Sequence, residues 1–182
     1  MANFSVPTRE EVTPQNQGIF DNLQKQVGFV PNLYATYAYS ETALGDYLAL
    51  SSRKTSLSGK EKEIINLVVS QVNECDYCLA AHTAIGKMNG FTDEQILEIR
   101  SGEASFDSKY DSLAKFVENA VINRSHPDAA VVDNLLASGY SKENLIDTIV
   151  VIGDKTISNF INGTTQIPID FPAAPELEPA LV

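Results

Sequence analysis

Cysteine is scarce in this sequence, because its 182 residues include only two cysteines and no tryptophan. Cys75 and Cys78 are three positions apart, so a bond between them closes too short a loop to constrain the unfolded chain strongly. A disulfide scaffold of the type found in small secreted domains is therefore excluded. In a reducing compartment this spacing indicates redox chemistry or metal ligation.

Positive charge is also scarce, since 13 Lys and Arg oppose 24 Asp and Glu, for a formal net charge of −11. Such a surface repels phosphate backbones and anionic lipids, so we expect no nucleic-acid partner and no membrane partner. The first residues lack the basic and apolar regions of a secretory signal. No apolar run approaches the ~18 residues of a membrane-spanning helix. These absences predict a cytoplasmic protein with one hydrophobic core.

Glycine and proline divide the chain into blocks of helical length. Ser58 and Thr92 each begin a capping box, with Glu61 and Gln95 three positions later. The β-branched runs 67–69 and 149–152 also fit buried strands, but the caps favour helix. We therefore expect helices over 14–27, 32–51 with a break near Ser40, 61–73, 76–87, from Thr92 onward, 107–124, 127–139 and 141–163.

Half of the prolines lie in the last fifteen residues, at positions 168, 172, 175 and 179. Proline lacks a backbone N–H, so this tail cannot form regular helix or a central strand. We predict one all-helical domain over residues 1–166 and an extended C-terminal arm over 167–182. The arm either packs on another subunit or is a frayed terminus.

The chemistry is expected where a helix begins near Asp76. Cys75, Cys78 and His82 then stand at positions i, i+3 and i+7, on one helical face. Both thiols lie at the helix N-terminus, where unpaired N–H groups and the helix dipole favour the thiolate. His82 lies one turn after Cys78, where it can accept the thiol proton. This pattern suits a two-cysteine redox cycle that passes through a sulfenic acid.

Glu63 is the candidate for orienting the histidine. If helices 61–73 and 76–87 form a hairpin that turns near Glu74, the axial offset between Glu63 and His82 is ~4.5 Å. The offset between Glu63 and Cys78 is ~10 Å, which is too far for direct contact. The arithmetic predicts a relay in the order Glu63, His82, Cys78.

Three other interpretations of these residues stay open. In a thioredoxin-like domain, the cysteine motif would follow a β-strand near residues 67–72. A structural zinc site could use Cys75, Cys78, His82 and His126. Finally, the cysteines, His82 and Glu63 could be ordinary packing or surface residues of a scaffold protein.

The spacing Glu-x(11)-Cys-x-x-Cys-x-x-x-His, met by Glu63, Cys75, Cys78 and His82, resembles the alkylhydroperoxidase D / carboxymuconolactone decarboxylase family. The resemblance covers residues 28–91 best, and the segment Ile169–Pro175 is similar to the peroxidase-related subgroup. It implies an all-α, single-domain helical bundle that assembles into homo-oligomers, trimers or hexamers.

The resemblance also implies cysteine-based reduction of a peroxide or disulfide substrate, with no cofactor and no metal ion. Cys78 would form the sulfenic acid, and Cys75 would donate a proton and resolve it. Glu63 and His82 would form the proton relay, and a thiol reductant such as a lipoyl carrier or thioredoxin would restore the thiols. Tyr77 stands where some peroxidase members carry a histidine. Decarboxylase members generally lack the cysteine pair, which disfavours lactone decarboxylation.

Overall fold

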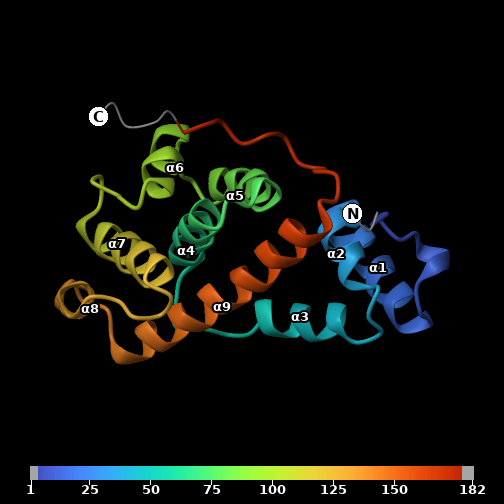
Figure 1. The fold of residues 1–182 in the computed structure, drawn as a ribbon, viewed down its shortest axis with the longest axis horizontal. Coiled ribbons are helices and arrows are strands. Elements are labelled where there is room, and N and C mark those ends of the chain that lie inside the picture. The colour runs from blue at the N-terminus through green and yellow to red at the C-terminus, as the bar shows by residue number, and fades with distance from the viewer. Residues whose placement is uncertain (1–3, 178–182) are drawn as a thin grey trace. The chain divides into compact units, whose positions relative to one another are not determined.

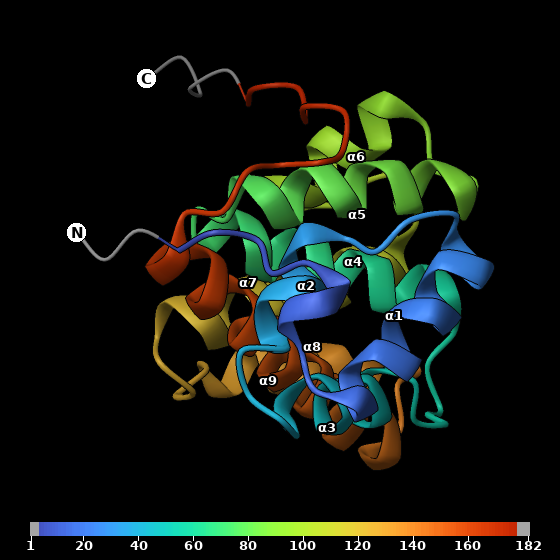
Figure 2. The same cartoon turned by 90° about the vertical axis from the view of Figure 1, so that its right-hand side faces the viewer.

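Helices are the only regular secondary structure in residues 4–177, which are the residues that the computed structural model describes (Figures 1 and 2). The predicted all-α fold is confirmed. Both β-branched runs are helical, since 67–69 lie in α4 (Gly59–Val72) and 149–152 lie in α9 (Lys142–Thr165). The thioredoxin-like interpretation, which needs a mostly β core, is therefore wrong.

The described chain forms two compact units. The first comprises residues 4–54 and 160–170, and the second comprises 55–159 and 171–177. Helix α9 contributes to both, because the division falls between Asn159 and Phe160. The division predicted at residue 166 stays a prediction about domain organisation.

The first unit contains a short 3-10 helix (Arg9–Glu11), α1 (Pro14–Val27), α2 (Asn32–Tyr37) and α3 (Ala43–Ser51). Thr13 caps α1, where its side chain accepts from the N–H of Asn16. The buried Asn16 amide donates to the carbonyls of Ala38 and Ser40, at 3.3 and 3.0 Å. These bonds hold the connection between α2 and α3, so the break expected near Ser40 is confirmed.

The second unit is built around α4. Five apolar residues of this helix are fully buried: Ile64, Ile65, Leu67, Val68 and Val69. Residues 63–70 of this helix are all buried, so other elements must surround it on nearly all sides. Here α4 packs against α5 (Asp76–Met88), α6 (Asp93–Arg100) and α7 (Ser108–Ile122), while α8 (Ala129–Ala137) packs on α7.

Both predicted capping boxes are confirmed. Ser58 and Glu61 form the capping box of α4, with bonds of 3.2 and 2.7 Å, and Thr92 and Gln95 form that of α6. Helix α9 ends at Thr165, two residues after the end expected near Gly163. The chain leaves the helix through Gln166, whose φ of 50° is left-handed.

Residues 166–177 contain no helix or strand, and Pro179 of the predicted arm lies outside the described residues. In the second unit, the Phe171 ring lies edge-on to Tyr77, with centroids 5.7 Å apart. The guanidinium of the buried Arg100 donates to the carbonyl of Pro175 at 2.6 Å. This part of the arm therefore packs on its own chain. Among the described residues, no helix has both the length and the apolar character needed to span a bilayer.

Candidate functional site

The turn between α4 and α5 places the cysteine motif. The N–H of Cys75 donates to the carbonyl of Ser70 at 2.9 Å, and the N–H of Glu74 donates to that of Gln71 at 3.1 Å. This bond pair is a Schellman motif, which usually has glycine in the left-handed position. Glu74 occupies that position here, with a φ of 52°. The turn near Glu74 is confirmed, and it delivers Cys75 to the start of α5.

Cys75 is the N-cap of α5, where its sulfur accepts from the N–H of Cys78 at 3.3 Å. The two sulfur atoms lie at disulfide-bonding distance, with Cα atoms 5.3 Å apart. Both cysteines are buried, with exposed fractions of 3% and 2%. Because both sulfurs lie at a helix N-terminus, the unpaired N–H groups there favour negative charge on sulfur in the reduced protein.

Glu63 and His82 form a buried contact between α4 and α5. The carboxylate Oε2 of Glu63 lies 2.7 Å from His82 Nδ1, and Oε1 accepts from the amide of Asn66 at 3.1 Å. The contact between Glu63 and His82 predicted from the hairpin arithmetic is confirmed. The relay role assigned to these two residues stays a prediction.

The electrostatics of the pair set its protonation state. Burial raises the pKa of the Glu63 carboxyl, but attraction to His82 and the hydrogen bond from it hold that pKa below its ordinary value. Burial lowers the pKa of His82, as does the positive charge of Lys155, and the opposing effect of Glu63 does not compensate. At neutral pH the pair therefore consists of an ionised carboxylate and a neutral imidazole.

This protonation state determines which nitrogen can act as a base. An ionised carboxylate only accepts hydrogen bonds, so Nδ1 of His82 carries the proton that it donates to Glu63. The lone pair of the neutral imidazole is then on Nε2. Cys78 lies four positions earlier on α5, on the same helical face as His82. The arrangement can therefore take a proton from a thiol and hold it beside a carboxylate.

The sequence did not single out Lys155, which lies on α9 and is 6% exposed. Its charge acts on both Glu63 and His82. One signal could have indicated it: Lys155 is four positions after Val151 and four before Asn159, which are both buried. A lysine on the buried face of a helix is rare unless it has a role there.

The alternative zinc set is not assembled. His126 lies in the exposed connection between α7 and α8. Across residues 4–177, no group of three or more His, Cys, Asp or Glu side chains is arranged to hold a metal ion. The geometry therefore gives the zinc interpretation no support.

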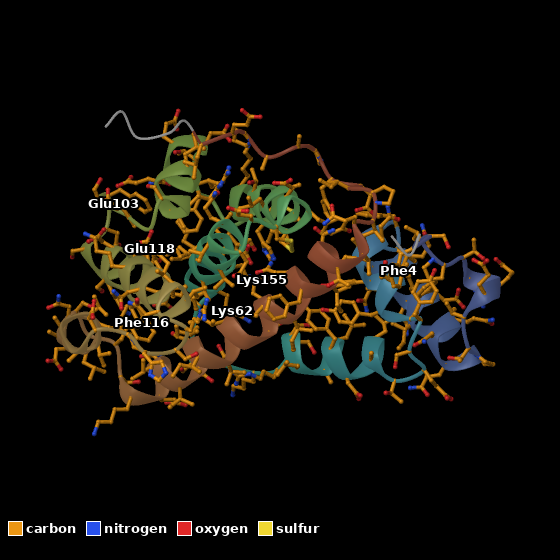
Figure 3. The ribbon with its side chains drawn as sticks, in the orientation of Figure 1. Phe4, Lys62, Glu103, Phe116, Glu118 and Lys155 are labelled. Atoms are coloured by element: carbon orange, nitrogen blue, oxygen red, sulfur yellow. A yellow bond between two sulfur atoms is a disulfide. The ribbon has the colours of Figure 1, made fainter. Side chains whose placement is uncertain are left out.

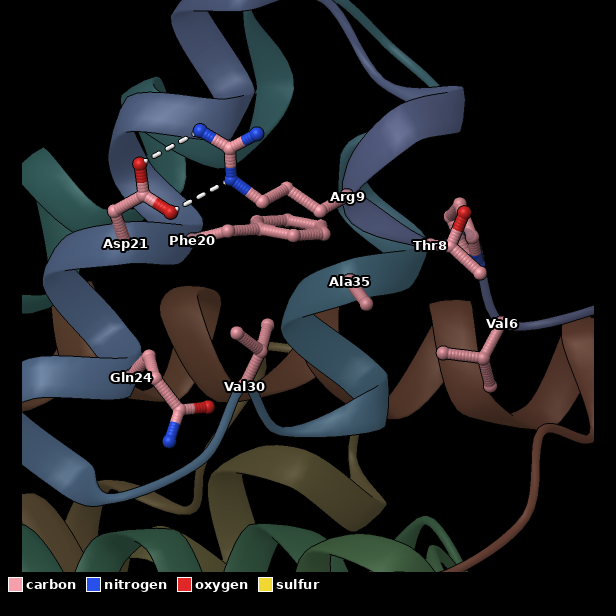
Figure 4. Close-up of a pocket in the computed structure, with 9 residues that line it drawn as sticks. Val6, Thr8, Arg9, Phe20, Asp21, Gln24, Val30 and Ala35 are labelled. Carbon is pink, nitrogen blue, oxygen red and sulfur yellow. Dashed lines mark hydrogen bonds and ion pairs between the residues drawn. The ribbon is translucent and has the colours of Figure 1, made fainter.

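The first unit contains a separate small cavity of about 280 Å³ (Figure 4). Phe20, Val30 and Ala35 form part of its wall. At its edge Arg9 forms a two-bond ion pair with Asp21, at 2.7 and 2.9 Å. The guanidinium already has a partner, so the cavity offers no unpaired charge to a ligand, and none of the four predicted site residues lines it.

Comparison with known proteins extends these observations. Residues 37–115 match the model of the carboxymuconolactone decarboxylase family. The Bacillus subtilis (strain 168) protein YdfG is 25% identical over 122 residues, which cover 65% of this chain and 78% of YdfG.

Solved structures share the fold at low sequence identity. A peroxidase-related protein from Silicibacter sp. TM1040 is 22% identical and has a TM-score of 0.82, covering 96% of this chain and 95% of its own. An alkylhydroperoxidase AhpD core protein from Ralstonia eutropha JMP134 is 20% identical, with a TM-score of 0.82 and 92% of each chain covered. The debrominase Bmp8 is 18% identical, with a TM-score of 0.76, covering 93% of this chain and 94% of its own. Residues 37–115 are thus similar to the carboxymuconolactone decarboxylase family, and the described chain has the fold of the alkylhydroperoxidase D type.

Proposed function

We propose that this protein is a thiol-dependent peroxidase that reduces peroxides through Cys78 and Cys75. One observation carries the proposal: two cysteines at disulfide-bonding distance begin the same helix that carries His82, whose imidazole contacts Glu63 at 2.7 Å. A dithiol that can close to a disulfide, next to a neutral base, has the parts that peroxide reduction by thiols requires.

In the first step, His82 Nε2 accepts the thiol proton of Cys78, and the imidazolium that forms is stabilised by Glu63. The thiolate then attacks the terminal peroxide oxygen. A sulfur–oxygen bond forms as the oxygen–oxygen bond breaks, so sulfur is oxidised and the peroxide is reduced. The leaving alkoxide or hydroxide takes up the proton from the His82 imidazolium and departs as an alcohol or water, which returns His82 to its neutral form.

In the second step, the sulfur of Cys75 attacks the sulfenic acid on Cys78. A sulfur–sulfur bond forms, the sulfur–oxygen bond breaks, and hydroxide takes up the Cys75 proton and leaves as water. A thiol reductant, of the lipoyl or thioredoxin type, then returns the disulfide to the dithiol by exchange. The Cα separation of 5.3 Å supports this step, because disulfides form at such separations.

Trapping the intermediate tests the proposal. In Cys75→Ser no resolving thiol remains, so one equivalent of hydrogen peroxide or cumene hydroperoxide should leave a sulfenic acid on Cys78. A dimedone-type probe followed by peptide mass spectrometry would locate it. Cys78→Ser is the matched control and should stay unlabelled. Labelling of Cys75 in that control would reverse the two roles, and no thiol oxidation in the unmodified protein would reject the peroxidase.

General disulfide reduction is the second candidate, because a cysteine pair at disulfide distance also serves thiol–disulfide exchange. Parallel assays with a peroxide and with a protein disulfide separate the two by their second-order rates. The debrominase Bmp8, which shares the fold, was solved in one structure as a complex with 2,3,4-tribromopyrrole. A brominated pyrrole is therefore a useful third oxidant in these assays.

A further inference from the structure

Lys155 is a buried cation that the proposed mechanism does not use. Its side chain comes from α9 (Figure 3) and is 6% exposed. The spacing of four residues puts it on the same helical face as the buried Val151 and Asn159. Burial lowers the pKa of its ammonium group, and the charges of the carboxylates Asp154 and Glu63 oppose that shift without cancelling it. Within residues 4–177, neither carboxylate forms an ion pair or a hydrogen bond with the ammonium group of Lys155. Burying most of a lysine side chain costs free energy, so its presence here calls for a reason.

The contacts between α4 and α9 show where Lys155 lies. Near the start of α9, Asp147 accepts from the N–H of Ser56, just before α4. Twelve residues later, Asn159 contacts Ser70 and Asn73, at 3.4 and 2.9 Å, near the end of α4. The two helices therefore run in the same direction over this stretch. Interpolation places Lys155 roughly level with residue 66, about one turn from Glu63.

The electrostatic couplings agree with this position. His82 is faced by Glu63 from α4, by Lys155 and Asp154 from α9, and by the cysteines of its own helix, α5. Lys155 lowers the pKa of His82 and of Glu63, whereas the two carboxylates raise that of His82. A carboxylate alone would draw a proton onto the imidazole, and a nearby cation opposes this.

We propose that Lys155 is the third member of the Glu63–His82 pair, a positioning residue that keeps the imidazole neutral in the resting enzyme and able to accept the proton of Cys78. Lys155 acts through His82 and touches neither the peroxide nor the reacting sulfur. This inference rests on the proposed function, since it assigns a cause to the protonation state that thiol activation needs. Burial also lowers the pKa of His82, and without Lys155 the balance shifts toward the imidazolium, which cannot take up another proton.

Titration of His82 by NMR in the full-length protein tests the inference directly. The chain has two histidines, so the exposed His126 serves as an internal reference. In the wild-type protein His82 should titrate below the ordinary value of 6.5. In Lys155→Met, which removes the charge and keeps a similar volume, it should titrate about one pH unit higher, as expected for the loss of a nearby like charge. Lys155→Arg retains the charge and should restore the wild-type titration.

The pH profile of thiol oxidation provides the functional measurement. The acid limb of the peroxide rate should move upward in Lys155→Met by the same interval as the NMR titration, and Lys155→Arg should reverse the shift. A wild-type His82 that titrates at or above the ordinary value overturns the inference without any variant. An unchanged His82 titration in a folded Lys155→Met does so as well. Because the titration needs no turnover, a protein that fails to reduce peroxides yet shows the His82 shift would reject only the peroxidase.

Discussion

At the scale of single residues, the buried Glu63–His82 contact is, after the two cysteines, the feature with the largest expected effect on rate. Both oxygens of the carboxylate are engaged, one by His82 and one by Asn66, so the imidazole is held in a defined orientation. Such a carboxylate fixes the histidine tautomer and raises its basicity. Loss of either member should therefore remove the benefit of both.

A double-mutant cycle tests this coupling. Glu63→Gln and His82→Asn should each slow the second-order oxidation of Cys78 at neutral pH by roughly 10- to 1,000-fold, the scale of a lost general base. The double variant should be little slower than either single variant, because the residues act as one unit. Stopped-flow measurement of thiol loss after peroxide addition gives the rates.

Glu74→Gln is the matched control for this cycle, since Glu74 is an exposed carboxylate of the same hairpin. Its rate should stay within about twofold of the wild-type rate, as expected for a substitution of similar size at an exposed side chain. Strictly additive losses in the cycle would show that Glu63 and His82 act independently, and the relay would then be wrong.

The depressed pKa of His82 also predicts a pH dependence of stability. A group whose pKa is lower in the folded state stabilises fully above its unfolded value, here near 6.5, and loses that contribution as the pH falls toward the folded value. The wild-type protein should therefore lose stability relative to His82→Gln between pH 7 and pH 5. The slope of the difference should approach about 1.4 kcal/mol per pH unit at most.

Urea unfolding of both proteins at several pH values, with the cysteine pair kept oxidised, measures this difference. Contributions of the many surface carboxylates cancel in the comparison, because both proteins carry them. A difference that stays constant from pH 7 to pH 5 would mean that His82 binds protons equally in the folded and unfolded states, contrary to its burial.

At the scale of elements, Glu74 and Gly28 form a natural comparison. Both follow a helix in the left-handed region, Glu74 with a φ of 52° after α4 and Gly28 with 92° after α1. A residue with a Cβ atom loses roughly 1 kcal/mol of stability in this region, whereas glycine, which has no Cβ, does not. Glu74→Gly should therefore raise the free energy of unfolding by about 0.5–1 kcal/mol, while Gly28→Ala should lower it by about 1 kcal/mol.

Denaturant unfolding monitored by circular dichroism gives both values. No heavy atom lies within 4 Å of a Cβ placed at Gly28, so the predicted loss comes from the backbone alone. Gly18, inside α1, is the control because it too has open space around a Cβ, and Gly18→Ala should stabilise by about 0.5–1 kcal/mol. A stabilising Gly28→Ala would show that the left-handed conformation is not required there.

The helices were predictable where local signals act alone. Thr13 with Pro14, the capping box at Ser58 and the box at Thr92 each satisfy backbone groups within one turn, so the starts of these helices follow from a few neighbouring residues. The Glu63–His82 contact was predictable for a similar reason. A short hairpin between two regular helices leaves only their register to determine, and the axial rise per residue gives it.

Long-range placement was less accessible. Lys155 belongs to the neighbourhood of Glu63 only because α9 runs alongside α4, and no pattern within α9 indicates its partner helix. The burial of individual apolar residues in α9 was equally inaccessible. Leu145 and Ile152 pack against the core, but Ile149 is 50% exposed. Helix α9 carries more apolar residues than one buried face accommodates, and periodicity alone does not say which face is covered.

At the scale of the whole molecule, those exposed residues have a consequence for assembly. Ile146, Ile149 and Ile157 of α9 are 60%, 50% and 43% exposed. At 100° per residue they fall within one side of the helix. Clustered exposed apolar side chains commonly mark protein–protein contacts. We propose that this side of α9 contributes to the homo-oligomer, trimer or hexamer, expected from the family resemblance.

Light scattering during size-exclusion chromatography tests the assembly. The wild-type protein should elute at a multiple of the 19.8 kDa chain mass. Ile149→Asp places a charge where an apolar contact would exclude water, so the complex should dissociate at protein concentrations that leave the wild-type protein assembled. Ile122→Asp, on α7 and 58% exposed, is the matched control and should assemble normally. Circular dichroism should be unchanged in both variants, because neither residue belongs to the buried core. A wild-type protein with the mass of one chain would show that no oligomer forms. An Ile149→Asp variant that still assembles would show that this side of α9 is not part of the interface.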